Sequence, residues 1–264
     1  MKLLCRPVTE LKMLNGLLIF MLMLCGPNLV QAQSSLKVGW EPAAPYQYLD
    51  SKGHLTGLDI ELFSAIAKKV NVKLEFKKIL WKKLLSEVEQ GTMDIALSAT
   101  KTAEREKFAF FSDPYRKEVI VLFVRRGESE KYHFKTLNDL VGSKFRLGVT
   151  SGNFYGKSFD LLMKNPTFVK QTEEASDDLS NYQKLLANKI DGFLADQTGT
   201  VIDIRKEGLN GKMDIYPMDI TTEDICFIFS RKSVKPDMVG TFNAGLKALK
   251  ASGDYDKIIN KFTK

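Results

Sequence analysis

One segment of this chain combines hydroxyls, backbone donors and a guanidinium within eight residues. It runs from Ser98 to Arg105 with the order Ser-Ala-Thr-Lys-Thr-Ala-Glu-Arg. The apolar residues before it predict a strand over 94–98, and Thr102 is a residue type that caps a short helix. A guanidinium binds a carboxylate through two parallel hydrogen bonds, and the N–H groups at a helix start supply further donors. Ser98, Thr100 and Arg105 are therefore candidates for an anion site, although on spacing alone Arg105 could equally pair with a neighbouring glutamate.

A carboxylate lies at the end of a strand in the second half of the chain. Asp196 follows an apolar run that predicts a strand over 190–195, and a helix is predicted to begin at Gln197. Taken alone, Asp196 is explained as well by a helix cap as by a binding site. Open α/β sheets bind ligands at the ends of their strands. A cation at one strand end and an anion at another, from the two halves of the chain, would match the two ends of a zwitterion.

A loop of small and polar residues separates a strand predicted over 145–149 from a helix predicted over about 153–165. Backbone N–H groups at a helix start suit a carboxylate or a phosphate, so Thr150 and Asn153 are further candidates. The tripeptide at 156–158 is Gly-Lys-Ser, but Ser151 stands where a phosphate-binding loop has its first glycine. We therefore predict no nucleotide site.

Aromatic and acidic side chains lie close to the first strand, which is predicted over 36–40. Trp40 lies at its end, Glu41 and Tyr46 follow it, and Trp81 begins a predicted helix. Aromatic residues at such positions more often pack in a core, but they can also wall a cleft and exclude water. Glu41 or Asp50 near a cleft would favour a cationic ligand, whereas Gln197 and Asn153 would suit glutamine.

Composition excludes several kinds of chemistry. The 264 residues include 2 His and 3 Cys, too few and too scattered for a zinc site or a histidine-based triad. The net charge is +7, but the lysines around Trp81 are followed closely by acids, which indicates a solvated helix face rather than a nucleic-acid surface. We predict no metal, no cofactor and no nucleic-acid partner.

Residues 1–32 have the pattern of a secretory signal peptide. Basic residues precede an apolar run over 17–25, and small residues lead to a cleavage site expected after Ala32. The run is shorter than the roughly 20 residues that span a bilayer. Leu24 precedes Cys25 where a lipobox has Gly or Ala, so we predict soluble export to the periplasm. Beyond the signal only Cys226 remains, and its apolar neighbours predict a buried thiol.

Strand and helix patterns alternate throughout the rest of the chain. This alternation predicts an α/β fold with mostly parallel sheets flanked by helices. The residues at 125–128 lack apolar periodicity and read as a linker between two lobes. Short strands are also predicted over 167–170, 213–218 and 225–230.

Four motifs resemble those of the family 3 bacterial extracellular solute-binding proteins and occur in the same order. They are Gly57–Leu62, Met93–Ala96, Thr102–Arg105 and Phe111–Tyr115. The resemblance covers essentially the whole chain after the signal and implies a type II periplasmic binding fold with a ligand cleft between two lobes. It places lobe 1 at 33–124 and 225–264, lobe 2 at 128–221, and hinges near 125–127 and 222–224.

The same resemblance implies a function and roles for individual residues. Arg105 is expected to hold the α-carboxylate of an amino acid with help from Ser98 and Thr100, Asp196 the α-ammonium, and Trp81 the aliphatic part. The chain is then a monomeric periplasmic receptor that captures a polar or cationic amino acid and delivers it to an inner-membrane ABC permease.

Two loops depart from the pattern of the family. Many members have Gly-Thr-Thr in the second-lobe loop, where this chain has Gly152-Asn153-Phe154. Asn153 can still donate a hydrogen bond, but Phe154 cannot replace a hydroxyl. An aromatic residue of the first loop is Ala43 here, and Trp40 is a possible substitute.

Two alternative functions remain open at this stage. Some relatives are cyclohexadienyl or arogenate dehydratases, which are expected to use a glutamate three residues after the cleft aspartate. This chain has Gly199 there, which argues against an enzyme, although Glu41 at the cleft mouth keeps the alternative open. The other alternative is a stand-alone amino-acid sensor, because the chain ends at Lys264 without a further domain.

Overall fold

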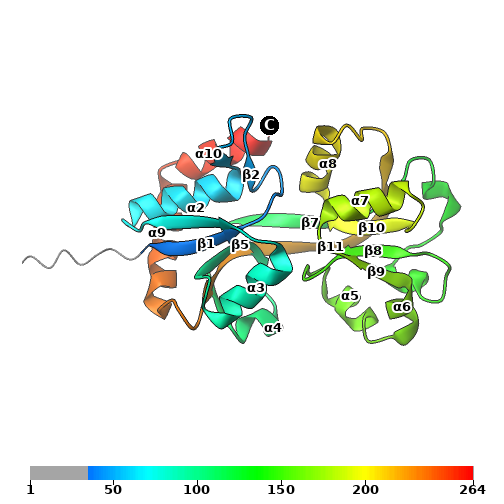
Figure 1. The fold of residues 1–264 in the computed structure, drawn as a ribbon, viewed down its shortest axis with the longest axis horizontal. Coiled ribbons are helices and arrows are strands. Elements are labelled where there is room, and N and C mark those ends of the chain that lie inside the picture. The colour runs from blue at the N-terminus through cyan, green and yellow to red at the C-terminus, as the bar shows by residue number, and fades with distance from the viewer. Residues whose placement is uncertain (1–34, 264) are drawn as a thin grey trace, which may run out of the picture. The chain divides into compact units, whose positions relative to one another are not determined.

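The computed structural model describes residues 35–263, in which helices flank a central sheet (Figure 1). The predicted signal peptide and its cleavage site lie outside the described residues. The first lobe contains β1 Leu36–Trp40, β2 Tyr48–Leu49, β3 Leu55–Thr56, α2 Leu58–Lys69, β4 Leu74–Lys78, α3 Trp81–Gln90, β5 Ile95–Thr100, α4 Ala103–Glu106, β6 Ala109–Phe111, α9 Pro236–Ala251 and α10 Asp254–Thr263. The second lobe contains the short 3-10 helices η1 Ser129–Lys131 and η2 Leu137–Leu140, then β8 Leu147–Thr150, α5 Lys157–Leu162, α6 Pro166–Gln171, β9 Thr172–Ala175, α7 Asp178–Leu186, β10 Gly192–Asp196 and α8 Gln197–Lys206.

Two long strands, β7 Arg116–Arg125 and β11 Met213–Ser230, run through both lobes (Figure 1). The strand order is β4-β1-β5-β11-β7-β10-β8-β9, with β6 paired to β11. Pairing is parallel within β4-β1-β5 and within β10-β8-β9, and antiparallel at β5-β11, β11-β7 and β7-β10. The two parallel sheets expected from the alternation are therefore joined into one, because β7 and β11 hydrogen-bond to each other across the boundary.

Each lobe has an apolar core of its own. In the first lobe, the buried face of α2 places Phe63 against Phe227 and Phe242, with ring centroids 4.8 Å apart in both pairs. In the second, Phe123 of β7 stacks on Phe193 of β10 at 5.2 Å. Burial of apolar side chains on both sides of the sheet stabilises each lobe separately, which accounts for the two-lobe architecture.

The predicted position of the first hinge is wrong. Arg125 ends β7, and its guanidinium donates to the Ile190 carbonyl at 2.6 Å and to Asp191 at 3.1 Å, both in the second lobe. Residues 120–124, assigned to lobe 1 from the sequence, pack in the cores of the second lobe. The crossing lies instead at about 117–119, where half-buried and exposed positions alternate before the buried run over 120–124. The loss of apolar periodicity at 125–128 marks the end of strand β7, but the chain crosses between the lobes inside that strand.

Four elements predicted from the sequence differ from the structure. The strand predicted over 167–170 belongs to helix α6, because the Asn165 side chain accepts from the Thr167 N–H and Pro166 begins the helix. The helix predicted from about Asn153 begins only at Lys157. The two strands predicted over 213–218 and 225–230 are parts of the single strand β11.

The sheet brings three strand ends to the crossing. Thr100 at the end of β5 lies opposite Ile225 of β11, and Asp196 at the end of β10 lies opposite Ile120 of β7. Because Thr221 of β11 pairs with Ile120, both ends approach the same short crossing segment. The end of β1 lies beside β5. Polar residues after these strands from both lobes therefore converge.

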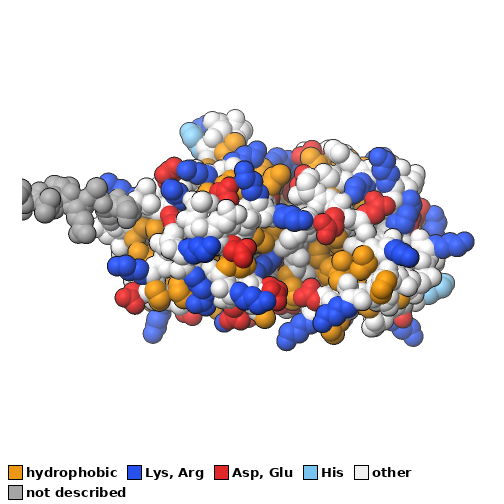
Figure 2. Space-filling model, turned by 60° about the horizontal axis from the view of Figure 1, so that its bottom comes forward, with side chains coloured by type: hydrophobic (Ala, Val, Ile, Leu, Met, Phe, Trp, Pro, Cys, Tyr) orange, Lys and Arg blue, Asp and Glu red, His pale blue; other side chains and the backbone are white. Residues whose placement is uncertain are grey.

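The surface charge is mixed on the face shown in Figure 2, where basic and acidic side chains are interspersed. Cys226 is buried and free, as its apolar neighbours indicate. Burial raises the pKa of its thiol to about 11. None of the helices within residues 35–263 is both long enough and apolar enough to cross a bilayer.

Candidate functional site

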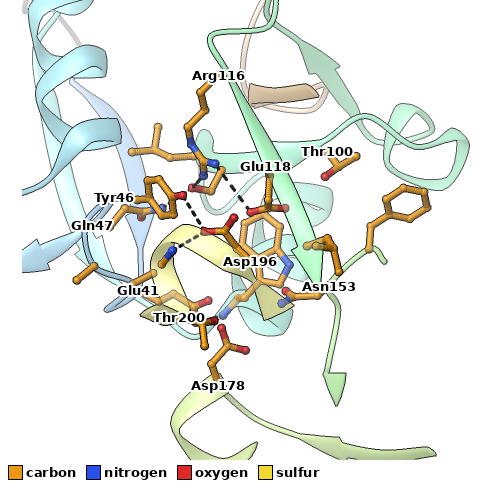
Figure 3. A pocket seen from close by; sticks show the side chains of 18 of the residues that line it. Glu41, Tyr46, Gln47, Thr100, Arg116, Glu118, Asn153, Asp178, Asp196 and Thr200 are labelled. Carbon is orange, nitrogen blue, oxygen red and sulfur yellow. Dashed lines mark hydrogen bonds and ion pairs between the residues drawn. The ribbon is translucent and has the colours of Figure 1, made fainter. Parts of the chain in front are cut away.

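A cavity of about 110 Å³ lies where the strand ends of the two lobes converge (Figure 3). Most of the residues singled out from the sequence line it: Glu41, Trp81, Ser98, Thr100, Arg105, Asn153 and Asp196. Other lining residues that the sequence analysis did not single out as binding residues include Tyr46, Gln47, Arg116, Glu118, Asp178, Thr200 and Asp203. First-lobe and second-lobe side chains thus share one enclosed volume.

Arg105 supplies the buried cation at this cavity. Thr102 caps α4 by accepting from the Arg105 N–H at 3.2 Å, which positions the side chain, and the residue is 7% exposed. The guanidinium donates to the Thr100 carbonyl at 2.8 Å and to the Gly152 carbonyl at 2.9 Å. A guanidinium has five N–H donors, so three remain for a carboxylate. Desolvation lowers the Arg105 pKa to about 10, which leaves the group charged at neutral pH.

The Gly152 carbonyl joins the two lobes. It accepts from Arg105 and also from the Trp81 indole N–H, at 3.0 Å, and both donors belong to the first lobe. A side chain at position 152 would be strained, since its φ is +87° and an added Cβ would lie 3.3 Å from the Trp81 ring. Glycine therefore permits the close approach of this second-lobe loop.

Asp196 both caps a helix and faces the cavity. Its Oδ2 accepts from the Gly199 N–H at 2.7 Å, which caps α8, and from the Tyr46 hydroxyl at 2.7 Å (Figure 3). Its Oδ1 is buried and has no hydrogen-bond partner among the described residues. An unpartnered carboxylate oxygen inside a cavity is a strong acceptor for a cationic donor. Asp196 is therefore a helix cap whose side chain also lines the cavity.

Ser98 contacts the protein rather than open space. It is a non-glycine residue with φ of +58°, and its hydroxyl donates to Asp59 and accepts from Gln47 at 3.1 Å and Arg116 at 3.0 Å. Arg116 also pairs with Asp59 at 3.1 Å, and its guanidinium stacks 3.8 Å from the Tyr46 ring centroid. The hydroxyl of Ser98 therefore positions the wall of the cavity and is not available to a ligand. The side chain of Thr100, by contrast, lines the cavity without an internal hydrogen bond among residues 35–263.

Two candidates lie outside the first cavity. Trp40 is 6% exposed and packs in the core of the first lobe, so it does not substitute for the aromatic missing at position 43; Tyr46 provides the aromatic wall instead. Thr150 donates to Asp178 and accepts from Asn181 at 3.1 Å, so it positions an acidic side chain.

Three of the lining residues missed from the sequence are acidic. Glu118 lies on the crossing part of β7, two residues after Arg116 and on the same face of the strand. The spacing of two residues between Arg116 and Glu118 could therefore have indicated from the sequence that Glu118 lies on the same face as Arg116. Asp178 lies in the first turn of α7, where an acidic residue is explained as well by the helix dipole, and Asp203 on α8 had no signal because its position depends on how the helix packs.

The acidic groups of the cavity have raised pKa values. Burial raises the pKa of Glu41, Glu118 and Asp203 to about 7 and that of Asp178 to about 6. Neighbouring carboxylates add to the shift, while the Trp81 N–H, which donates to Glu41 at 2.8 Å, opposes it. The cavity therefore holds several carboxyl groups that lack sufficient cationic partners.

These shifts predict that the protein without a ligand loses stability as pH rises. In the unfolded chain these carboxyls titrate near pH 4, and in the folded protein near 6–7. The folded state therefore binds more protons in this interval, so its stability falls as pH rises from about 4 through 7. We expect the Tm to be several degrees lower at pH 8 than at pH 5.5 in thermal scans at constant ionic strength. The pKa of Asp191 is lowered to about 2, so this residue changes the stability only at a pH below this interval. A Tm that is unchanged or higher at pH 8 would contradict the assignment.

No cluster of His, Cys, Asp and Glu suited to a metal ion was found within residues 35–263. The hydrogen-bonding groups that line the cavity are instead one available guanidinium, hydroxyls, amides and carboxylates. This combination suits an organic zwitterion, whose carboxylate and ammonium need a donor group and an acceptor group at fixed separation.

Comparison with known proteins is consistent with this geometry. The profile described as "Bacterial extracellular solute-binding proteins, family 3" matches residues 36–264. A "Probable histidine-binding protein" of Campylobacter jejuni is 30% identical over 235 residues, 86% of this chain and 84% of the relative. A protein of Neisseria gonorrhoeae with the same description is 29% identical over 233 residues, 83% of this chain and 79% of the relative. The solved structure of "An ancestral arginine-binding protein bound to arginine" superposes with a TM-score of 0.75 at 27% identity, covering 87% of this chain and 98% of that one.

Proposed function

Because the chain belongs to the bacterial extracellular solute-binding proteins of family 3, we propose that it is a receptor that captures a free amino acid between its two lobes. The observation that carries this proposal is the pairing of Arg105 and Asp196 in one cavity. Arg105 has unused donors for an α-carboxylate, and Asp196 has an unpartnered buried oxygen for an α-ammonium. The two groups come from different lobes, so only a molecule with both charges engages both.

The contacts across the cleft support closure around the ligand. Trp81 and Arg105 contact the Gly152 carbonyl, Tyr46 contacts Asp196, and an exposed ion pair joins Lys82 to Glu174 at 3.8 Å. A ligand held by both lobes has greater affinity for the closed arrangement and shifts the population toward it. We place the hinges at the crossing segments, 117–119 and 222–224. These hinges leave lobe 1 at 35–116 and 225–263 and lobe 2 at 120–221.

Trp81→Phe is expected to weaken closure. The change keeps an aromatic ring but removes the indole N–H that donates to the Gly152 carbonyl. One neutral hydrogen bond contributes about 1 kcal/mol, so calorimetry should show amino-acid affinity reduced roughly three- to tenfold. Trp40→Phe, the same change in the core outside the cavity, is the matched control. Equal affinities for Trp81→Phe and wild type would show that this contact does not contribute to closure.

Delivery to a membrane transporter is the biological role that we assign to this receptor. Export through the predicted signal peptide places the monomeric protein in the periplasm, where an inner-membrane ABC permease would distinguish the closed, loaded form by its shape. The membership in a family of extracellular solute-binding proteins supports this assignment. We propose no resident cofactor and no nucleic-acid partner.

An enzymatic role is disfavoured by the surroundings of Gly199. An added Cβ there would lie 3.1 Å from Asp196 Oδ2, 3.2 Å from the Ala44 carbonyl and 3.3 Å from the Tyr46 ring. The glutamate expected of a dehydratase at this position would therefore require these neighbours to shift by a few tenths of an ångström. Both curated relatives are also described as binding proteins.

A thermal-shift screen of the mature chain against the twenty amino acids tests the proposal. A ligand at 100 times its Kd adds about 2.7 kcal/mol to the free energy of unfolding, which raises the Tm by several degrees. We expect one or a few amino acids to give such a shift. The absence of a shift with every amino acid, for a protein that melts cooperatively, would overturn the proposal.

A further inference from the structure

A second chamber of about 310 Å³ adjoins the first cavity. The two share six lining residues, Glu41, Ala43, Ala44, Asn153, Asp178 and Asp203. The first cavity already contains the groups that would hold the carboxylate and ammonium of an amino acid. A longer ligand side chain can therefore continue past the shared residues into the second chamber.

The shared wall carries two carboxyl groups that form no close ion pair among the described residues. Asp178 extends from the start of α7 toward the cavity (Figure 3), and Asp203 lies on α8. Neither forms an ion pair within residues 35–263, although Lys78 and Lys206 also line the chamber. The Asp178 carboxyl accepts from Thr150 through one oxygen, and the Asp203 carboxyl makes no hydrogen bond among residues 35–263. Burial is the main cause of the raised pKa of each carboxyl, and neighbouring carboxylates add to it, while Lys206 lowers the pKa of Asp203.

A second observation points to a polar ligand in this chamber. Tyr182 lines it and is 1% exposed, and its hydroxyl interacts with the Thr200 side chain without forming a hydrogen bond of full geometry among the described residues. Buried hydroxyls are nearly always hydrogen-bonded in proteins. A donor held between Asp178 and Asp203 would also be near this oxygen, since all three side chains line the same chamber.

We propose that Asp178 and Asp203, with the Tyr182 hydroxyl, form the subsite for a cationic group at the far end of the ligand side chain. The inference rests on the proposed function, because the first cavity must hold the zwitterionic end. A side chain of three or four carbons that ends in an ammonium or a guanidinium meets both requirements. Carboxylate pairs bind a guanidinium with several charge-assisted hydrogen bonds. The ligand class is thus a dibasic amino acid.

Calorimetry with L-arginine, L-lysine and L-citrulline on the mature chain at pH 8 tests the subsite. Citrulline has nearly the shape of arginine but no charge on its side chain. Wild type should bind arginine or lysine at least tenfold more tightly than citrulline. Asp203→Asn should remove most of that preference by weakening the cationic ligand about tenfold, with citrulline binding little changed. Asp178→Asn should have the same effect. If loss of the Thr150 contact prevents Asp178→Asn from folding, the result with Asp203→Asn alone tests the subsite.

Controls separate this subsite from the binding of the zwitterion and from general charge effects. Asp237→Asn makes the same change in protein charge at an exposed position on α9 and should leave all affinities unchanged. Equal affinity of wild type for arginine and citrulline, or an equal loss of both in Asp203→Asn, would overturn the inference while the proposed function stands. No binding of any amino acid would instead overturn the proposed function.

Discussion

Replacing Arg105 with alanine is expected to weaken the binding of every amino acid by more than a hundredfold. The guanidinium is buried, and its three unused donors are the charged donor set that we assign to the carboxylate. Loss of a bidentate, charge-assisted pair costs on the order of 3 kcal/mol, which corresponds to more than two decades in Kd. Calorimetry with the ligand found in the thermal-shift screen measures the loss.

The Arg105 prediction needs a control for structural damage. The variant loses the hydrogen bonds from the guanidinium to the Thr100 and Gly152 carbonyls, although the Trp81 indole N–H still donates to Gly152, so a lower Tm is expected, with a circular dichroism spectrum like that of wild type. Arg231 also donates to two backbone carbonyls, those of Glu106 and Ala109, but lines neither cavity. Arg231→Ala should therefore bind like wild type. Near-wild-type affinity in Arg105→Ala would show that Arg105 does not hold the carboxylate of the ligand.

Asp196→Asn is expected to lower the affinity for all amino-acid ligands by a similar, large factor. Asparagine can still accept from the Gly199 N–H and the Tyr46 hydroxyl through its one oxygen, so the helix cap and the wall of the cavity remain. The amide N–H₂ then replaces the unpartnered Oδ1 and presents a donor to an ammonium. Loss of a buried, charged acceptor costs about 3 kcal/mol, again about a hundredfold in Kd.

A second helix-cap aspartate provides the comparison for Asp196. Asp177 caps α7 by accepting from the Ser180 N–H at 2.8 Å and does not line the first cavity. Asp177→Asn should leave the binding of neutral amino acids unchanged. If Asp196→Asn also binds neutral amino acids with wild-type affinity, Asp196 serves only as a cap, and the ammonium must be held elsewhere.

The positions of Arg105 and Asp196 were predictable because each follows an apolar run that forms a strand. Polar residues at such strand ends converge in α/β sheets whatever their separation in sequence. The same reasoning placed Thr100 and Asn153 on the cavity. It failed for Ser98, whose left-handed backbone directs the hydroxyl to Asp59 and Arg116. No local pattern indicates such a reversal within a strand.

The remaining differences come from packing between distant residues. Arg116 and Asp59 are 57 positions apart, and their ion pair sets the place of Tyr46, so the choice of Tyr46 rather than Trp40 as the aromatic wall depended on tertiary contacts. The crossing was misplaced because β7 continues for several residues into the second lobe with an unbroken apolar pattern. Sequence periodicity reports that a strand continues, but not which core each part of it joins.

The most direct measurement of the central claim compares one ligand with its two singly blocked derivatives. The ligand is the amino acid with the largest thermal shift, and the derivatives are its methyl ester, which removes the carboxylate charge, and its N-acetyl form, which removes the ammonium. Calorimetry on the mature chain should give each derivative a Kd at least a hundredfold higher than that of the parent, because each leaves either Arg105 or Asp196 without its charged partner. Binding of either derivative as tightly as the parent would contradict a site that holds both ends of a zwitterion.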